Sequence, residues 1–237
     1  QALFARLSCF QGGAPLEAIE PGFREATGHR LSYTSASTGQ LYALIRNGAP
    51  FDLMLSADQD RPRRLVDEGL GDADTLHTYA VGRLALWSRD PSRISEDALS
   101  ELPHSGFRYF AIAEPELAPY GAAAVQALER LGIWADLDPS RIVRGQNVSQ
   151  AFAMIETRGA DLGIVALSQA LAYPGSAAWI VVPDNLHDPI RQDAVLLTRS
   201  RHRDAALALL DYLKTPPAIA LLERDGYARE GHAATSR

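Results

Sequence analysis

Strand-like and helical segments alternate along almost the whole chain, and this alternation constrains the fold more than any other feature. Leu16, Ile19 and Phe23 recur at the spacing of one helix face, and Phe51–Leu55 is an apolar run typical of a buried strand. Such alternation favours parallel sheets with helices on both faces. Because there are too many strand–helix units for one five-stranded sheet, we predict an α/β protein of two lobes. Its ligand cleft is expected at the carboxyl ends of the strands.

The pattern predicts helices and strands at defined positions. Helices are expected over residues 15–27, 39–47, 61–68, 121–131, 148–157, 204–214 and 217–225. Strands are expected over residues 30–34, 51–56, 79–88, 107–113, 141–144, 162–166, 180–183 and 194–198. Residues 1–13 do not read as a buried first strand, because Arg6 interrupts their apolar pattern.

Composition excludes several classes of protein. The 237 residues carry a net charge of −6, which argues against nucleic-acid binding, since that needs a basic face. No run approaches the roughly 18 apolar residues of a membrane span. Cys9 is the single cysteine, so an internal disulfide and a cysteine metal motif are both excluded. Residues 1–10 lack the apolar core of a signal peptide, and we expect a leader to be absent or already removed.

Four junctions that lead into predicted helices suit the binding of an oxyanion. They offer backbone N–H groups, small or hydroxyl side chains and the positive end of a helix dipole. Each alone is an ordinary helix cap, but four in one α/β chain without a competing catalytic motif favour a bound anion. The four are Ser35–Gln40, Ala118–Gly121, Gly145–Ser149 and Phe10–Pro15.

With Asn47–Pro50, Tyr79–Leu84 and Leu162–Gln169, these stretches resemble the periplasmic molybdate-binding proteins of ABC transporters. The resemblance covers most of the chain, and the order and spacing of the phrases make it specific. It implies a two-lobed, type II periplasmic-binding-protein fold, each lobe a mixed, mainly parallel sheet flanked by helices. Lobe 1 is expected at 1–80 plus 195–237 and lobe 2 at 81–194, with the ligand cleft between the lobes. Closure is expected around residues 79–81 and 190–194.

The resemblance also implies which residues bind the anion. The family's strand-to-helix serine corresponds to Thr38, which follows Ser37, and the family's backbone donors correspond to Tyr120 and to Val148, which follows Asn147. The first loop departs from the family: without gaps Gln11 takes the asparagine position, and with a two-residue insertion Cys9 does. A tyrosine that some members use is replaced here by Ala166. No catalytic residue, no cofactor and no metal beyond that of the oxyanion is expected.

The resemblance therefore predicts a periplasmic, monomeric binding protein, mature after leader removal, that captures molybdate and tungstate for a membrane-embedded ABC permease. A cavity of donors suits a tetrahedral dianion, whereas the O–H of hydrogen-phosphate would lack an acceptor. Two alternatives stay open: a binder of another oxyanion such as sulfate, and an effector-binding module of a regulator. An enzyme is the remaining rival, because Asp52 and Asp58 flank a strand, but no catalytic motif accompanies them. Asp58 is more simply the cap of the next helix.

Overall fold

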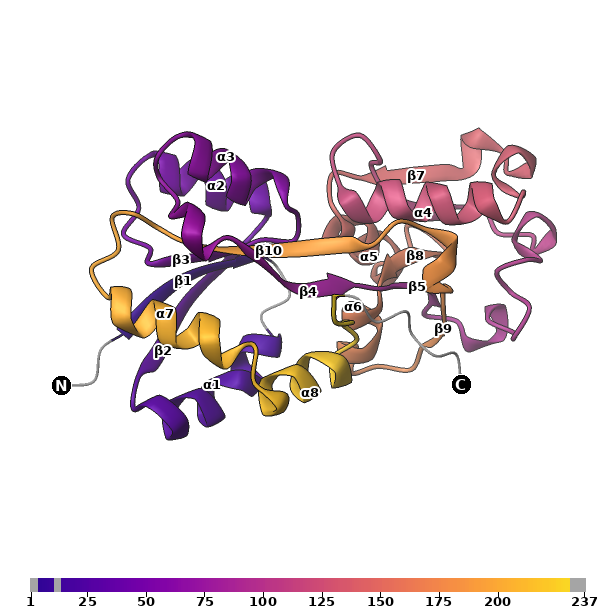
Figure 1. Ribbon diagram of the computed structural model, residues 1–237. Coiled ribbons are helices and arrows are strands. Elements are labelled where there is room, and N and C mark those ends of the chain that lie inside the picture. Colours follow the sequence, from indigo (N-terminus) through magenta and orange to yellow (C-terminus); the bar gives the residue numbers. More distant parts are fainter. Residues whose placement is uncertain (1–3, 11–13, 231–237) are drawn as a thin grey trace. The chain divides into compact units, whose positions relative to one another are not determined.

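The computed structural model describes residues 4–10 and 14–230, which fall into two compact units (Figure 1). Unit 1 holds the described residues up to Val81 and again from Arg191 onward, and unit 2 runs from Gly82 to Ile190. The chain therefore leaves unit 1 within one strand and returns at the start of another. The sequence placed these boundaries after residues 80 and 194.

Unit 1 contains a five-stranded mixed sheet in the order β2-β1-β3-β10-β4. Strands β1, β2 and β3 are parallel, and β10 is antiparallel to β3. The strands are β1 (Phe4–Phe10), β2 (Arg30–Ala36), β3 (Leu53–Leu55), β4 (His77–Gly82) and β10 (Ile190–Leu196). The helices are α1 (Ala14–Thr27), α2 (Thr38–Arg46), α3 (Asp60–Asp67), α7 (Arg203–Tyr212) and α8 (Pro216–Arg224).

The first strand exists although the sequence argued against it. Residues Phe4–Phe10 form β1, and backbone pairing on both sides holds it: Leu7 pairs with Tyr33 of β2 and with Leu53 of β3. Pairing with two neighbours satisfies the backbone along this strand, so a single arginine in the pattern does not prevent it. Gln11 and the two glycines that follow lie outside the described residues.

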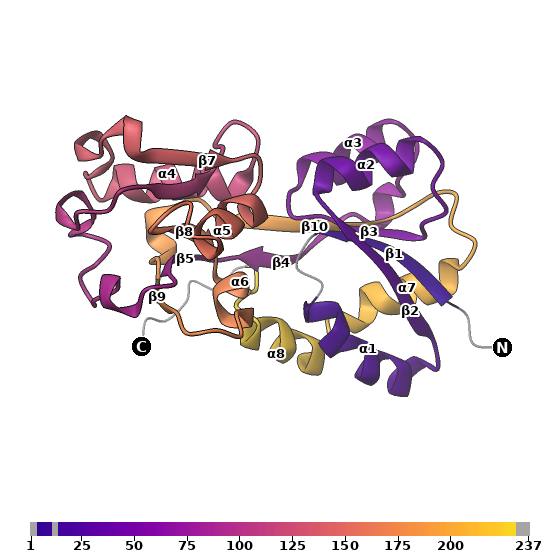
Figure 2. The same cartoon turned by 180° about the vertical axis from the view of Figure 1, so that it is seen from behind.

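Helices cover both faces of the unit 1 sheet (Figures 1 and 2). Helices α2 and α3 lie on one face, and α1, α7 and α8 lie on the other. Leu41 and Leu65 pack with Met54 under the first pair, while Ile19, Phe23 and the leucines of α7 form the core under the second set. Apolar side chains project from both faces of this sheet, so helices must cover both faces to bury them.

Unit 2 contains a second five-stranded mixed sheet, in the order β7-β6-β8-β5-β9. Strand β6 is parallel to β7 and β8, whereas β5 is antiparallel to β8 and β9. The ring of Trp87 is fully buried and stacks on Phe152 at 4.5 Å between centroids. The elements are β5 (Leu84–Ser88), β6 (Phe110–Ala113), α4 (Pro119–Arg130), β7 (Ile142–Gly145), α5 (Val148–Glu156), β8 (Leu162–Ala166), α6 (Leu167–Ala172) and β9 (Ala178–Val181).

Two sequence predictions in this region were wrong. Residues 79–88 were expected as one strand, but they form β4 and β5, which belong to the sheets of different units. The break falls at Arg83, whose side chain pairs with Asp184 at 3.1 Å and whose carbonyl accepts a hydrogen bond from the Leu167 N–H. Helix α6 was not expected, because its six residues are too few to show a helical period.

Among the described residues, no single helix is long and apolar enough to cross a bilayer. Helices α7 and α8 reach that length and composition only when taken together, and they are bent by 69° at their junction. Leu209, Leu210 and Leu222 of this pair lie in the unit 1 core.

Phe23→Ala should lower the free energy of unfolding by about 3–5 kcal/mol, because it leaves a cavity in the unit 1 core. Phe23 is fully buried and packs edge-on against Tyr212 at 5.7 Å between ring centroids. Urea unfolding followed by circular dichroism measures the change. The control Leu44→Ala removes a side chain that is 42% exposed and should cost less than about 0.5 kcal/mol. Equal losses in both variants would contradict this description of the core.

Candidate functional site

The first helix start with available donors lies in unit 1, where β2 leads into α2. Ser37 is the N-cap, and it forms a capping box with Gln40. The Oγ of Ser37 accepts from the Gln40 N–H at 3.3 Å, and the Oε1 of Gln40 accepts from the Ser37 N–H at 3.2 Å. The N–H groups of Thr38 and Gly39 have no acceptor within the helix, because they belong to its first turn. They point toward the space before the helix, where an anion is favoured.

Thr38 adds a side-chain donor at the same place. It is the first residue of α2, and its side chain is only 7% exposed. Its hydroxyl forms no hydrogen bond with any residue in the described ranges. With no protein partner, this hydroxyl is available to donate a hydrogen bond to a ligand at the start of the helix.

The end of β1 lies beside this helix start. Strands β1 and β2 are parallel neighbours, and Phe10 pairs with Ala36 at their ends. The chain therefore leaves β1 next to Ser37, and it continues into Gln11. That residue, which the sequence named as a candidate ligand, lies outside the described residues.

Two further helix starts share one edge of the unit 2 sheet. Strands β6 and β7 are parallel neighbours, and Ala113 pairs with Gly145 at their ends. Helix α4 follows β6 and helix α5 follows β7, so both begin at the edge where these strands end. The structure thereby brings Tyr120, Asn147 and Val148 to one edge of unit 2, while Ser37 and Thr38 lie in unit 1.

Two glycines let these helix starts approach the strands. A Cβ on Gly121 would lie 2.3 Å from the carbonyl oxygen of Ala113, and one on Gly145 would lie 2.5 Å from the Ala151 nitrogen. Both distances are shorter than any van der Waals contact, and the atoms met are backbone. Only glycine therefore allows the first turn of each helix to pack directly on a strand end.

The two helix starts are capped in different ways. The Oδ1 of Asn147 accepts from the Gln150 N–H at 2.9 Å, so Asn147 is an N-cap. Ala118 precedes α4 without a side-chain acceptor, and Pro119 occupies the first helical position. Val148 is buried at the first position of α5, where its N–H has no intrahelical acceptor. The ring of Tyr120 is buried as well, which makes it part of a wall.

The predicted ligands are uncharged at neutral pH, so the positive potential comes from the helix starts themselves. The nearest basic side chain in the sequence, Arg144, forms an ion pair with Glu114 at 3.3 Å. Within residues 4–10 and 14–230, no three His, Cys, Asp or Glu side chains converge as a metal site. The arrangement can hold an anion by hydrogen bonds without bringing a formal counter-charge.

The two aspartates that suggested an enzyme both cap helices. Asp58 Oδ1 accepts from the Arg61 N–H at 3.0 Å in the first turn of α3, a capping bond of the kind that the sequence predicted, although Gln59 occupies the N-cap position itself. Asp52 is buried, and its Oδ1 accepts from Ser200 Oγ at 2.8 Å and from the His202 N–H at 3.1 Å, just before α7. These carboxylates stabilise local structure and form no catalytic pair.

Sequence reasoning missed a buried polar cluster in unit 1. Asp193 of β10 accepts from Thr78 Oγ1 of β4 at 2.7 Å and from Gln59 Nε2 at 3.1 Å. Tyr79 donates to Gln192 Oε1 at 3.1 Å. The chain crosses between the units along β4 and β10, so the cluster fixes these two strands where they enter unit 1. The sequence did contain a signal for this cluster, because the polar residues Gln192 and Asp193 directly precede the apolar run of residues 194–197.

Comparison with known proteins identifies the family. Residues 11–228 match the family of bacterial extracellular solute-binding proteins. The molybdate-binding protein ModA of Rhodobacter capsulatus is 42% identical over 216 residues, which cover 91% of this chain and 84% of that protein. The chain belongs to the molybdate-binding protein family.

The structure of a family member agrees. The periplasmic molybdate-binding protein of Azotobacter vinelandii superposes with a TM-score of 0.80 at 34% identity, covering 95% of this chain and 99% of that one. The ModA protein of Escherichia coli is 30% identical over 219 residues, covering 90% of this chain and 83% of that protein. These findings confirm the predicted resemblance, and the fold is that of the type II periplasmic binding proteins. Members of the molybdate-binding protein family bind a solute and are not enzymes.

Asn147→Ala should lower the free energy of unfolding by about 0.5–2 kcal/mol, because α5 loses its N-cap acceptor. Thermal or urea unfolding measures this loss. Asn185 is an exposed asparagine of the same unit whose side chain forms no hydrogen bond in the described residues. Asn185→Ala should therefore stay within about 0.5 kcal/mol of the parent. If Asn147→Ala is equally silent, the capping geometry described here is wrong.

Proposed function

We propose that this chain captures molybdate outside the cytoplasm and delivers it to an ABC permease. Relatives at 42% identity in Rhodobacter capsulatus and Azotobacter vinelandii are molybdate-binding proteins. A structural neighbour from Clostridium difficile is described as the substrate-binding domain of a putative molybdenum ABC transporter. An extracytoplasmic location follows from the same function, because the solute is bound before it crosses the membrane.

The environment of Thr38 is the observation that carries the proposal. This residue is largely buried, and its hydroxyl stands at a helix N-terminus without a hydrogen-bond partner in the described residues, so it is available to donate to an anion. It occupies the position at which the resemblance places the family's ligand serine. The added methyl group of threonine leaves the donor in place.

The proposed donors are the residues at the helix starts described above. Thr38 and Ser37 would contribute from unit 1, and the backbone of Tyr120 and Val148, with Asn147, would contribute from unit 2. Gln11 completes the set, since its amide can donate where the family has an asparagine. Closure would occur about the strands β4 and β10, whose positions near the unit boundaries support this role.

The same arrangement favours a fully deprotonated dianion over hydrogen-phosphate. The side-chain oxygens of Ser37 and Asn147 already accept hydrogen bonds from Gln40 and Gln150. The backbone N–H groups of Tyr120 and Val148 cannot accept from the O–H of hydrogen-phosphate, and an O–H that faced only such donors would cost about 1–3 kcal/mol. Each helix start contributes roughly 0.3–1 kcal/mol of favourable interaction with a negative charge, and more where water is excluded.

Tungstate shares the charge and tetrahedral shape of molybdate, so the protein should bind tungstate as well. We also expect the protein to act as a monomer. Sulfate offers the same acceptors and is the second candidate. The sulfate-binding protein SubI of Mycobacterium tuberculosis shares the fold, with a TM-score of 0.75 at 18% identity. That similarity concerns the fold alone.

Isothermal titration with molybdate, tungstate, sulfate and phosphate tests the proposal. We expect one site per chain with sub-micromolar dissociation constants for molybdate and tungstate, and much weaker binding of sulfate and phosphate. Tight binding of sulfate alone would replace molybdate with the second candidate. The absence of heat with all four anions would refute an oxyanion-binding function.

Thr38→Ala should weaken molybdate binding at least tenfold, about 1.4 kcal/mol or more, because it removes a side-chain donor. Thr38→Ser keeps the hydroxyl and should bind like the parent. Thr157→Ala is the matched control, since that exposed hydroxyl donates to the Ala153 carbonyl at the end of α5. An unchanged affinity of Thr38→Ala would show that the site lies elsewhere.

A further inference from the structure

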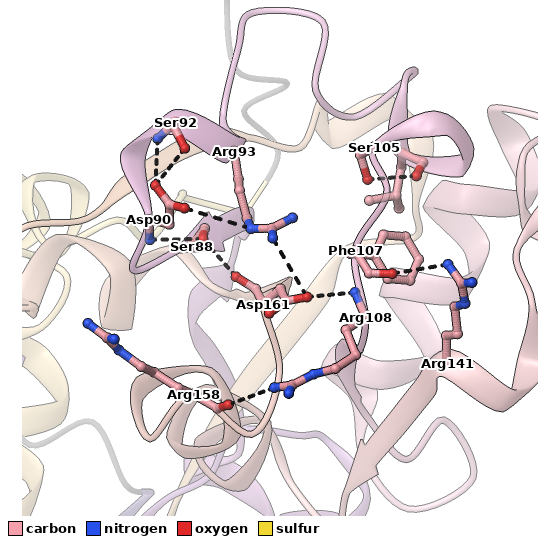
Figure 3. Close-up of polar contacts among 11 residues, drawn as sticks. Ser88, Asp90, Ser92, Arg93, Ser105, Phe107, Arg108, Arg141, Arg158 and Asp161 are labelled. Atoms are coloured by element: carbon pink, nitrogen blue, oxygen red, sulfur yellow. Dashed lines mark hydrogen bonds and ion pairs between the residues drawn. The ribbon is translucent and has the colours of Figure 1, made fainter.

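A charged cluster lies on unit 2, at the opposite edge of the sheet from the starts of α4 and α5. It is a recess of about 610 Å³ where β6 and β8 begin and α5 ends. We call it the arginine recess, because its charged lining consists of four arginines and two aspartates. These residues are Arg89, Arg93, Arg108, Arg158, Asp90 and Asp161. Figure 3 shows all of these except Arg89.

The lining carries an excess of positive charge. Four arginines against two aspartates leave a charge of +2, in a chain whose net charge is −6. Both aspartates are engaged by the protein: Asp161 Oδ2 accepts from the Arg108 N–H at 2.6 Å, and Asp90 Oδ1 accepts from Ser92 Oγ at 2.7 Å. Hydrogen bonds from Ser92 hold the pKa of Asp90 below its ordinary value, so this carboxylate stays charged at neutral pH.

Two of the arginines have a structural role. Arg89 Nη1 donates to the carbonyl of Glu156 at 2.7 Å, and Arg108 Nη2 donates to the carbonyl of Arg158 at 3.3 Å. These carbonyls belong to the C-terminal end of α5, which has no intrahelical donors for them. Basic side chains at this position also interact favourably with the helix dipole.

The other two guanidinium groups donate no hydrogen bond to a described residue. Arg93 lies 3.9 Å from both Asp90 and Asp161, which is an ion-pair distance but too long for a hydrogen bond. The side chain of Arg158 forms no hydrogen bond or ion pair with any residue of the described ranges. Both therefore have N–H groups available for an acceptor in the recess.

The backbone of Arg158 is unusual as well. Its φ of 64° is the only positive value at a non-glycine residue in the described part of the chain. Five other helices end in a glycine at the equivalent left-handed position; these glycines are Gly28, Gly48, Gly69, Gly132 and Gly226. An arginine where glycine is favoured costs stability, and such outliers gather where the side chain serves a function.

We propose that the arginine recess is a second anion site that binds a phosphate monoester group. Such a group carries close to two negative charges at neutral pH, which matches the charge of the lining. The planar guanidinium fork fits its oxygens in a bidentate manner. Arg93 and Arg158 would bind the group directly, while Arg89 and Arg108 add positive potential. The source is a soluble phosphate ester or the phosphatidic acid headgroup of a membrane.

Two titrations of the full chain at low ionic strength test the site and separate its sources. One uses glycerol 3-phosphate with protein that holds one equivalent of molybdate, and the other uses phosphatidic acid vesicles with phosphatidylcholine vesicles as the reference. We expect saturable, submillimolar binding in at least one arm. Binding in the first arm identifies a soluble ester, and binding in the second alone identifies the headgroup. No binding in either arm overturns the proposal.

Variants locate the binding within the recess. Arg158→Gly and Arg93→Gln should each weaken it at least tenfold, while Arg63→Gln, an exposed arginine of α3, should leave it unchanged. Arg158→Gly relieves the left-handed strain, so its melting temperature should equal or exceed that of the parent. Thr38→Ala should not affect the recess, so failure of the molybdate proposal remains distinguishable. Parent-like binding by both recess variants would refute this site.

Discussion

The structure depends on parallel neighbouring strands that end in register. Phe10 stands beside Ala36 in unit 1, and Ala113 stands beside Gly145 in unit 2. Because each strand is followed by a helix, in-register ends bring helix starts together at one sheet edge. First-turn N–H groups have no acceptor in their own helix, so they accumulate at that edge. An anion can then be held without any charged side chain.

Side chains refine this backbone arrangement. Ser37 and Asn147 use their oxygens to cap the helices, which leaves donors rather than acceptors for a ligand. Gly121 and Gly145 allow the first turns to pack directly on the strand ends. In unit 1, Thr38 adds a side-chain hydroxyl at the first position of α2. Each residue serves the local fold and the proposed site together, which explains why short phrases of this sequence carry the family resemblance.

The two edges of the unit 2 sheet would offer opposite chemistry to the two proposed anions. Helix starts supply neutral donors at one edge, whereas arginines gather at the other, around the end of α5. Helix dipoles favour a small dianion. Guanidinium groups at an open recess suit a larger phosphate group that stays partly hydrated. One sheet can thus present two separate anion sites.

The alternation of apolar strands and amphipathic helices determined the α/β class, most element positions and the division into two lobes. Short sequence motifs also identified the family, because these motifs form helix caps and turns, which depend on neighbouring residues only. Tertiary structure alone decided that Phe4–Phe10 is a strand and that residues 79–88 split between two sheets, since both depend on distant pairing partners. It also decided that Asp193 joins Thr78 and Gln59, and that four dispersed arginines share one recess. Sequence spacing records none of these contacts, because each forms between segments that only the folded chain brings together.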